Sequence, residues 1–221
     1  MKHLLEDLRS AAFPPRCGAC GGPLGACELG FCGACAVTLL TPAPGLLRLA
    51  KGRLVAARAL WLYGGAVRDA LVRMKHQPSP AVVAQLAELL ALECPTPPRP
   101  QGLLVPVPSL PLHWLTRGFS PPQELARRLS RCWGWKLAPA LAMRGLGHGQ
   151  AGRGGAARRR GQRLRLKGAG ARQVEGRHLV LLDDVATTGA TLREGATLLL
   201  DAGAASVQAL VLAVVEPLPW R

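Results

Sequence analysis

Apolar residues are spaced along this chain in two ways, one with the period of a helix and one in short continuous runs. The helical spacing predicts helices over residues 66–75, 81–92, 120–132 and 191–201. The continuous runs predict buried strands over residues 103–107, 180–182 and 206–215, and the stretch 46–63 fits either a helix or a strand. Strands that alternate with helices predict an α/β fold with a parallel sheet, in which ligands bind at the carboxyl ends of the strands.

Turn-forming residues predict where several of these elements begin and end. Ser120 with Gln123 fits a capping box at the start of the third predicted helix. Gly203 fits the C-terminal cap of the last helix. Proline-containing stretches over residues 41–45 and 94–101 predict linkers between elements.

The stretch LVLLDDVATTGATL, residues 179–192, carries the most specific chemistry. Its apolar residues end in Asp183 and Asp184, a short loop of small and hydroxyl residues follows, and a helical pattern begins behind the loop. Because a buried unpaired carboxylate is costly, two adjacent acids after a buried strand indicate a binding role rather than an ordinary turn. Carboxylates accept hydrogen bonds from ribose hydroxyls, and the amide groups at a helix N-terminus hold phosphate. The stretch therefore predicts a sugar-phosphate site.

Cysteines near the start of the chain are paired in a way that is typical of a structural zinc site. Cys17 and Cys20 form one CxxC pair, Cys32 and Cys35 form another, and eleven residues separate the pairs. Two such pairs supply four thiolates for a tetrahedral zinc ion that has no open position. Disulfide bonds are the alternative, which a cytoplasmic location disfavours. Cys27 lies between the pairs and is a candidate to replace one ligand.

Composition favours a folded, cytoplasmic protein. The chain has 221 residues, 49% of them apolar, which suffices for one α/β domain with a small appendage. No apolar run reaches the roughly 18 residues that a membrane-spanning helix needs. Residues 1–10 lack the long apolar centre of a signal peptide. We therefore expect a cytoplasmic protein without a membrane span.

The net charge is +15, and much of it lies in one segment. From Arg144 to Arg177 ten residues are Lys or Arg, and Glu175 is the single acid. A solvated basic loop is one interpretation of this segment, and a site for pyrophosphate, nucleic acid or both is the other. Because the segment has no Phe, Trp or Tyr, it does not predict a base-stacking platform.

Residues 179–192 resemble the 5-phosphoribosyl-1-pyrophosphate (PRPP) motif of type I phosphoribosyltransferases, in which two acids separate a hydrophobic strand from a Thr/Gly-rich loop. The resemblance implies that Asp183 and Asp184 hold the ribose hydroxyls. It assigns the 5-phosphate to the hydroxyl and glycine residues of the loop, which are Thr187, Thr188, Gly189 and Thr191. The whole motif gives the expected PRPP-binding residues as Asp183, Asp184, Val185, Ala186, Thr187, Thr188, Gly189, Ala190 and Thr191.

Almost the whole chain resembles the competence protein F (ComF) family, which joins an N-terminal zinc ribbon to a type I phosphoribosyltransferase domain. The segments that carry the resemblance are FPPRCGAC at 13–20, Tyr63 with the helix ending at Lys75, VPVPSLPLHWLTRGF at 105–119, and Arg144, Gln150 and Arg158 in the basic segment. The resemblance implies a zinc ribbon with a leading helix over residues 1–45. It implies a parallel-sheet type I phosphoribosyltransferase fold over residues 46–221.

The resemblance also implies a role in natural transformation, on the cytoplasmic side of the uptake of single-stranded DNA, with a DNA-uptake helicase as a candidate partner. PRPP would bind with Mg²⁺, and its pyrophosphate charge would be offset by basic residues. The candidates for that task are Lys75, Arg117, Arg144 and Arg158. Three hypotheses stay open: a phosphoribosyltransferase of nucleoside metabolism with an unidentified acceptor, a PRPP-liganded module that binds single-stranded DNA, and a PRPP-sensing regulator without catalysis.

Overall fold

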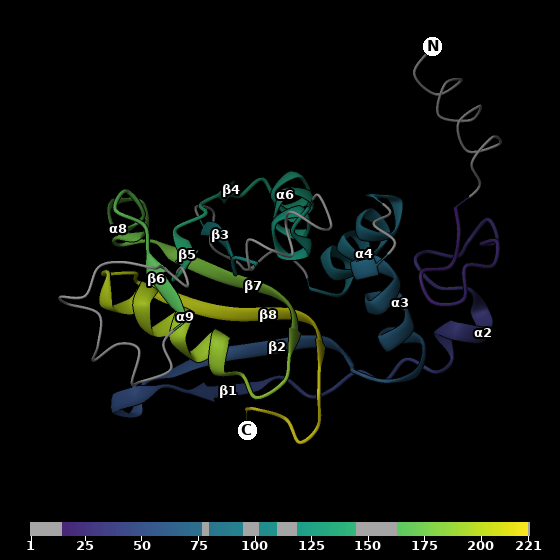
Figure 1. Ribbon diagram of the computed structural model, residues 1–221, viewed down its shortest axis with the longest axis horizontal. Coiled ribbons are helices and arrows are strands. Elements are labelled where there is room, and N and C mark those ends of the chain that lie inside the picture. Colours follow the sequence, from purple (N-terminus) through teal and green to yellow (C-terminus); the bar gives the residue numbers. More distant parts are fainter. Residues whose placement is uncertain (1–14, 77–79, 95–101, 110–118, 145–162, 221) are drawn as a thin grey trace, which may run out of the picture.

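A central sheet of six strands, in the order β1-β2-β8-β7-β3-β4, organises the molecule (Figure 1). The computed structural model describes residues 15–76, 80–94, 102–109, 119–144 and 163–220. The strands of the sheet are β1 (Gly45–Arg48), β2 (Leu54–Leu62), β3 (Gly102–Pro106), β4 (Lys136–Leu137), β7 (His178–Ala186) and β8 (Ser206–Val214). All neighbouring pairs are parallel except β1 with β2, which form an antiparallel edge. The predicted α/β fold with a parallel sheet is confirmed, apart from the antiparallel strand β1 at one side.

Helices cover both faces of this sheet and create two cores. The helices α3 (Gly65–His76), α4 (Pro80–Glu93) and α6 (Pro121–Trp133) pack on one face, and α8 (Gly170–Val174) and α9 (Ala190–Asp201) pack on the other. Successive residues of β7 face opposite cores, as strand geometry requires: Leu182 packs with the α3 side and Leu181 with the α9 side. A separate ribbon of β5 (Leu141–Met143) and β6 (Leu164–Leu166) lies beside α9, and the remaining short helices are α2 (Gly33–Ala36) and the 3-10 turn η1 (Ala50–Gly52).

The structure settles one element that the sequence left open and lengthens one predicted strand. The ambiguous stretch 46–63 forms strands, because its buried and exposed residues alternate along β2. The strand predicted over 180–182 continues as β7 through both aspartates to Ala186. The apolar run of β8 continues alongside it and supplies hydrogen-bonding partners, with Asp183 opposite Val211.

The predicted capping box at α6 is wrong. Ser120 is the N-cap residue, but its side chain makes no capping hydrogen bond. Its hydroxyl lies instead 2.8 Å from the Ser109 hydroxyl, in the segment that follows β3. Because Ser120 is only 4% exposed, this pairing satisfies a buried polar group and fastens α6 to the end of β3. At the other end of the sheet the Gly203 prediction is confirmed: this residue has φ +87° and its N–H donates to Leu200 O as α9 ends.

The four-cysteine segment, residues 15–36, packs against α3 and α4 rather than standing apart. Cys17 and Phe31 are buried in the same core as Trp61 of β2. The Phe31 and Trp61 rings meet edge to face with centroids 5.3 Å apart. Gly30 has φ +72°, which favours glycine, and a Cβ there would lie 2.6 Å from Leu89 Cδ1, so the segment approaches α4 closely here. The leading helix expected before this segment lies outside the described residues.

Within the described part of the chain, no helix is long and apolar enough to cross a lipid bilayer.

Candidate functional site

Four parallel strands, β2, β8, β7 and β3, end at one edge of the sheet. Backbone hydrogen bonds join neighbouring strands just beyond their ends: Tyr63 N–H donates to Val214 O, Val215 N–H to Ala186 O, and Val107 N–H to Leu182 O. The chain leaves each strand into a loop at this edge, which is where parallel sheets bind their ligands. The predicted sugar-phosphate residues lie at the carboxyl end of β7 and in the loop behind it. Strand β7 lies between β8 and β3, in the interior of the sheet.

Asp184 is held by a lysine from a different element. Lys75 Nζ, near the end of α3, lies 2.7 Å from Asp184 Oδ2, and the two side chains are 28% and 14% exposed. Asp184 Oδ1 accepts the Val185 N–H, and Asp183 Oδ1 accepts the Asp184 N–H, each at 2.9 Å. The structure therefore brings together three of the predicted site residues and fixes both carboxylates by backbone contacts.

Asp183 is the electrostatically strained member of the pair. Burial raises the pKa of Asp183 well above its usual range, and the neighbouring Asp184 charge raises it further, while Lys75 opposes the shift. In the free protein Asp183 therefore keeps its proton to a higher pH than an ordinary aspartate. A ligand that brings a cation or hydroxyl donors favours the ionised carboxylate, so such a ligand relieves the strain.

The loop after β7 leads directly into the N-terminus of α9. Thr187 and Thr188 are exposed, and Gly189 is the N-cap residue with φ +69°. A Cβ on Gly189 would lie 2.9 Å from Pro219 Cβ, so the C-terminal segment closes against the loop here. The first amide groups of a helix have no partner within the helix and carry its positive dipole end. In the free protein Ala190 N–H donates to Thr188 Oγ1 at 3.3 Å. The start of the helix and the loop hydroxyls can hold a phosphate group.

Arg193, which the sequence analysis did not single out, supports this loop. Its Nη1 donates to Thr188 O, its Nε to Arg48 O and its Nη2 to Pro219 O, at 2.5, 3.2 and 2.7 Å. One guanidinium thus joins the loop, β1 and the C-terminal segment. An arginine in the first turn behind the loop was visible in the sequence, but its partners are up to 145 residues away and no local pattern reveals them.

The other predicted basic residues are not part of this cluster in the described structure. Arg144 follows β5, is exposed, and donates from Nε to Leu164 O at 2.9 Å. Within the described ranges, no hydrogen bond or ion pair joins Arg144 to either aspartate. Arg117 and Arg158 lie outside the described residues.

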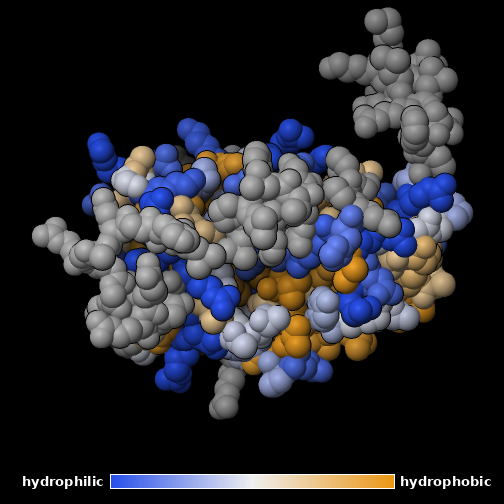
Figure 2. All heavy atoms as spheres, viewed as in Figure 1, coloured by the Kyte–Doolittle hydropathy of each residue, from blue (hydrophilic) through white to orange (hydrophobic). Residues whose placement is uncertain are grey.

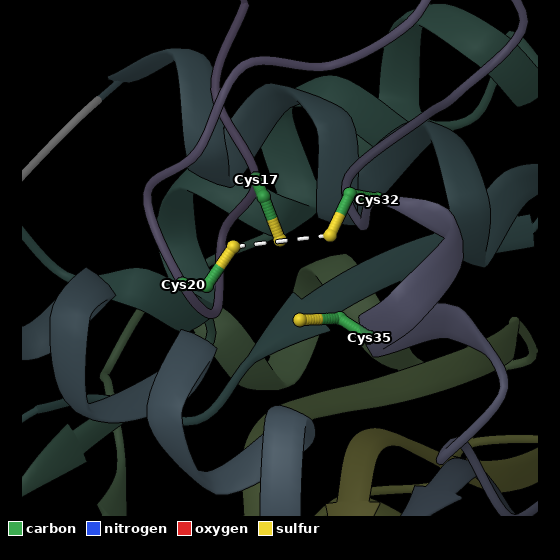
Figure 3. Close-up of side chains that lie close together, drawn as sticks. All are labelled: Cys17, Cys20, Cys32 and Cys35. Carbon is green, nitrogen blue, oxygen red and sulfur yellow. Dashed lines mark hydrogen bonds between the residues drawn. The ribbon is translucent and has the colours of Figure 1, made fainter.

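The second candidate site is the cluster of Cys17, Cys20, Cys32 and Cys35, whose sulfur atoms point toward one centre (Figure 3). All four Sγ atoms lie within 4.8 Å of one another, and those of Cys20 and Cys32 are 3.8 Å apart. A tetrahedral zinc ion with Zn–S bonds of about 2.3 Å holds its sulfurs about 3.8 Å apart. All seven cysteines are free, and Cys27 lies outside the cluster. The four-cysteine set therefore fits a metal such as zinc.

The thiol chemistry of the cluster fits a bound cation. Burial raises the pKa of Cys17, but backbone hydrogen bonds from Cys32, Cys20 and Ala19 outweigh it and lower this pKa to about 6. Burial, hydrogen bonds with the Cys32 and Cys17 side chains and the Cys17 charge raise the pKa of Cys35 to about 12. Without a metal, one thiolate thus opposes formation of the next. A divalent ion offsets this repulsion and allows all four to ionise.

Further contacts connect the cysteine cluster to α3. Glu28 ties the loop between the two CxxC pairs to the second pair by accepting the Gly25 and Gly33 N–H groups, and these bonds lower the pKa of Glu28. Arg73 on α3 donates to Ala19 O at 3.2 Å. Because Lys75 lies two residues further along the same helix, α3 touches both the cysteine cluster and the aspartate pair.

Comparison with known proteins agrees with this architecture. Residues 115–216 match the phosphoribosyl transferase domain. The DNA utilization protein YhgH of Escherichia coli (strain K12) is 31% identical to this chain, over 88% of this chain and 95% of the relative. The protein of that name from Salmonella typhimurium matches with the same identity and coverage. The chain belongs to the ComF family of phosphoribosyltransferase-like proteins. A ComF-family chain is expected to have a four-cysteine cluster followed by a phosphoribosyl transferase domain. This chain has both, and the matched domain includes β7 and α9.

Solved structures that align with part of this chain are more distant in sequence. Glutamine PRPP amidotransferase from B. subtilis aligns with a TM-score of 0.46 and 21% identity, covering 63% of this chain and 30% of that chain. Hypoxanthine phosphoribosyltransferase from Trypanosoma cruzi aligns with a TM-score of 0.36 and 20% identity, covering 60% of this chain and 65% of that chain.

Proposed function

We propose that this protein binds PRPP with Mg²⁺ at the carboxyl end of β7, and that it acts with this ligand in the handling of DNA in the cytoplasm. The observation that carries the proposal is the pair Asp183–Asp184, held by Lys75 and followed by a hydroxyl-rich loop at the N-terminus of α9. The DNA role is supported by the near full-length similarity to DNA utilization proteins.

Each part of the sugar phosphate has a matching group at this edge of the sheet. The carboxylates of Asp183 and Asp184 would accept hydrogen bonds from the ribose hydroxyls. The amides at the start of α9, with Thr187, Thr188 and Thr191, would hold the 5-phosphate. Lys75, which neutralises Asp184 in the free protein, lies where it would also face the pyrophosphate charge.

Carboxylate oxygens suit Mg²⁺, so the residues present fit that ion. Because Lys75 already neutralises Asp184, we propose that the ion arrives with PRPP rather than binding to the protein alone. When bound, Mg²⁺ supplies charge neutralisation for the pyrophosphate. The four-cysteine cluster would hold a structural zinc ion that stabilises the surface against which α3 packs.

Thermal unfolding tests the PRPP proposal. Magnesium–PRPP is added to the wild-type chain and to an Asp183→Asn/Asp184→Asn variant, and the shift of the melting temperature on addition is compared. Because a ligand that binds the folded state stabilises it, we expect a clear upward shift for the wild type and almost none for the variant. Asp69→Asn on α3, an exposed acid paired with Arg68, is the control that should retain the shift. An equal shift in the double variant would contradict the assignment.

A second candidate function is direct binding of single-stranded DNA. Over the described residues from 121 to 177, ten residues are basic and two are acidic, Glu124 and Glu175. The basic residues are Arg127, Arg128, Arg131, Lys136, Arg144, Arg163, Arg165, Lys167, Arg172 and Arg177. Such an excess attracts a polyanion, and DNA phosphates are the polyanion that the relatives' name indicates.

Fluorescence anisotropy with a labelled oligothymidylate tests this second function. We expect affinity to fall steeply with salt concentration, and an Arg131→Ser/Lys136→Ser variant to lower the log–log salt slope by about one unit per lost phosphate contact. Arg68→Ser, which removes an exposed cation on α3, is the control. No binding at low salt would contradict DNA contact by this chain.

A further inference from the structure

One arginine behind the loop that follows β7 joins three segments that are far apart in the sequence. Arg193, in the first turn of α9, donates from Nη1 to Thr188 O in the loop. Its Nε donates to Arg48 O of β1, and its Nη2 donates to Pro219 O of the C-terminal segment. A guanidinium presents its N–H donors in one rigid plane, so a single side chain fixes three backbone oxygens relative to one another.

The C-terminal segment, residues 215–220, is itself anchored beside β1. In Figure 1 it continues from the end of β8 and turns back toward β1. Trp220 is 4% exposed, and its indole N–H donates to Ala43 O, just before β1. A Cβ on Gly189 would come within 2.9 Å of Pro219 Cβ, so this segment touches the loop directly as well as through Arg193. The loop therefore leans on a partner that is fixed elsewhere in the fold.

The position of Arg193 is electrostatically unfavourable in the free protein. The N-terminal end of a helix carries partial positive charge, which favours acids and disfavours cations there. The first turn of α9 has no acidic residue, and within the described residues no carboxylate forms an ion pair with Arg193. The next residue, Glu194, accepts the Leu164 N–H of β6 at 2.8 Å instead. An anion bound at the loop would compensate both the helix end and the guanidinium.

The bond to Thr188 O also decides which backbone groups the loop can offer to a ligand. A carbonyl oxygen turned toward a phosphate would repel it, because both carry negative charge. Arg193 occupies Thr188 O and so keeps this oxygen from turning toward an anion. Thr187 and Thr188 are exposed, and on the face drawn in Figure 2 hydrophilic side chains lie around the start of α9. The loop is thus held through its backbone and remains open to a ligand from solvent.

We propose that Arg193 is a positioning residue for the 5-phosphate of PRPP, which holds the loop 187–189 in its phosphate-binding shape by linking it to β1 and the C-terminal segment. The inference rests on the proposed function, because it concerns the phosphate part of the same ligand. Arg193 acts through the backbone of Thr188 and through its charge, without touching the sugar or the pyrophosphate. Its loss should therefore weaken every ligand that carries the 5-phosphate by the same factor.

Calorimetric titration of the full chain with magnesium–PRPP and with ribose 5-phosphate tests this assignment. Arg193→Met removes the three hydrogen bonds and the charge, and we expect it to weaken both ligands by about tenfold or more. Arg193→Lys keeps the charge without the planar group and should recover part of the loss for both ligands. The matched control is Arg53→Met, which removes an arginine paired with Asp201 at the other end of α9. It should leave both affinities within about twofold.

A positioning role and a loss of fold give different results. Melting temperatures of the free variants show whether Arg193→Met is folded, and a purely structural role would predict neither an equal factor for the two ligands nor recovery by Arg193→Lys. The inference is overturned if Arg193→Met binds both ligands within about twofold of the wild type, or if Arg53→Met weakens them as much. Failure of the proposed function is recognised separately, because the wild type then binds neither ligand and both proposals fall.

Discussion

At the residue scale, Asp183 occupies a position that disfavours its own charged form. Burial and the adjacent charge raise the pKa of Asp183, so its ionised form is disfavoured in the free, folded protein. Groups held in such unfavourable states concentrate at functional sites, where a ligand compensates them.

The substitution Asp183→Asn should therefore stabilise the free protein while removing PRPP binding. The pKa of Asp183 is higher in the folded state than the value of about 3.9 expected when unfolded. Between these two values the folded state binds more protons, so its stability falls as pH rises through that range. Asparagine cannot ionise and avoids the fall. Denaturant unfolding at about pH 5 and about pH 8 should show a larger gain for the variant at the higher pH. A variant that is less stable than the wild type at both would contradict the burial argument.

Gly189 is the second residue whose identity is dictated by its place. Its φ of +69° favours glycine, and a Cβ would meet Pro219 at 2.9 Å. We expect Gly189→Ala to cost at least about 1 kcal/mol of unfolding free energy and to weaken PRPP binding by displacing the loop. Gly168→Ala is the control, since nothing lies within 4 Å of a Cβ there and its φ is not positive. Equal stability and PRPP affinity in both variants would show that the loop tolerates displacement.

At the scale of elements, α3 is the connection between the two candidate sites. Its Arg73 contacts the backbone of the cysteine segment, and its Lys75 contacts Asp184. Helix α9, which begins just behind the loop of Thr187 and Thr188, packs on the opposite face of the sheet. The two helices should therefore respond differently when the cysteine cluster is perturbed.

Removing metal with a chelator should loosen α3 and leave α9 unchanged. Because the cysteine segment covers part of the core that α3 shares, its loss should raise amide hydrogen exchange in α3 by about tenfold or more. Exchange measured by mass spectrometry resolves the two helices. Cys27→Ser should keep the metal and Cys17→Ser should lose it. Unchanged exchange in α3 after metal loss would mean that the cluster does not support Lys75.

Local patterns predicted most elements, and long-range contacts account for the rest. The helices α3, α4, α6 and α9 and the strands β3 and β8 follow from apolar spacing, because their burial repeats with their own geometry. The end of β7 was missed because the partner strand β8 decides it. The local pattern at Ser120 predicts a side-chain cap and is wrong, because the Ser120 hydroxyl pairs with Ser109, which follows β3. The contacts of Arg193 depend on segments that only the fold brings together.

At the scale of the whole molecule, the aspartate pair and the loop that follows it lie at the end of the sheet where the parallel strands finish. The C-terminal segment closes against this loop at Gly189 and Arg193. The cysteine cluster lies at the far side of α3, where it supports the helix rather than the ligand. The arrangement combines the aspartate pair, the loop at the start of α9 and the four-cysteine cluster in one chain that is similar to DNA utilization proteins.

Calorimetric titration of magnesium–PRPP into the intact chain tests the central claim most directly. The account predicts one binding site per chain, lost in Asp183→Asn/Asp184→Asn and kept in Asp69→Asn. Binding should also release protons, because the ligand favours the ionised form of Asp183. The absence of binding to the folded wild type, or equal binding to the double variant, would contradict a PRPP site at the end of β7.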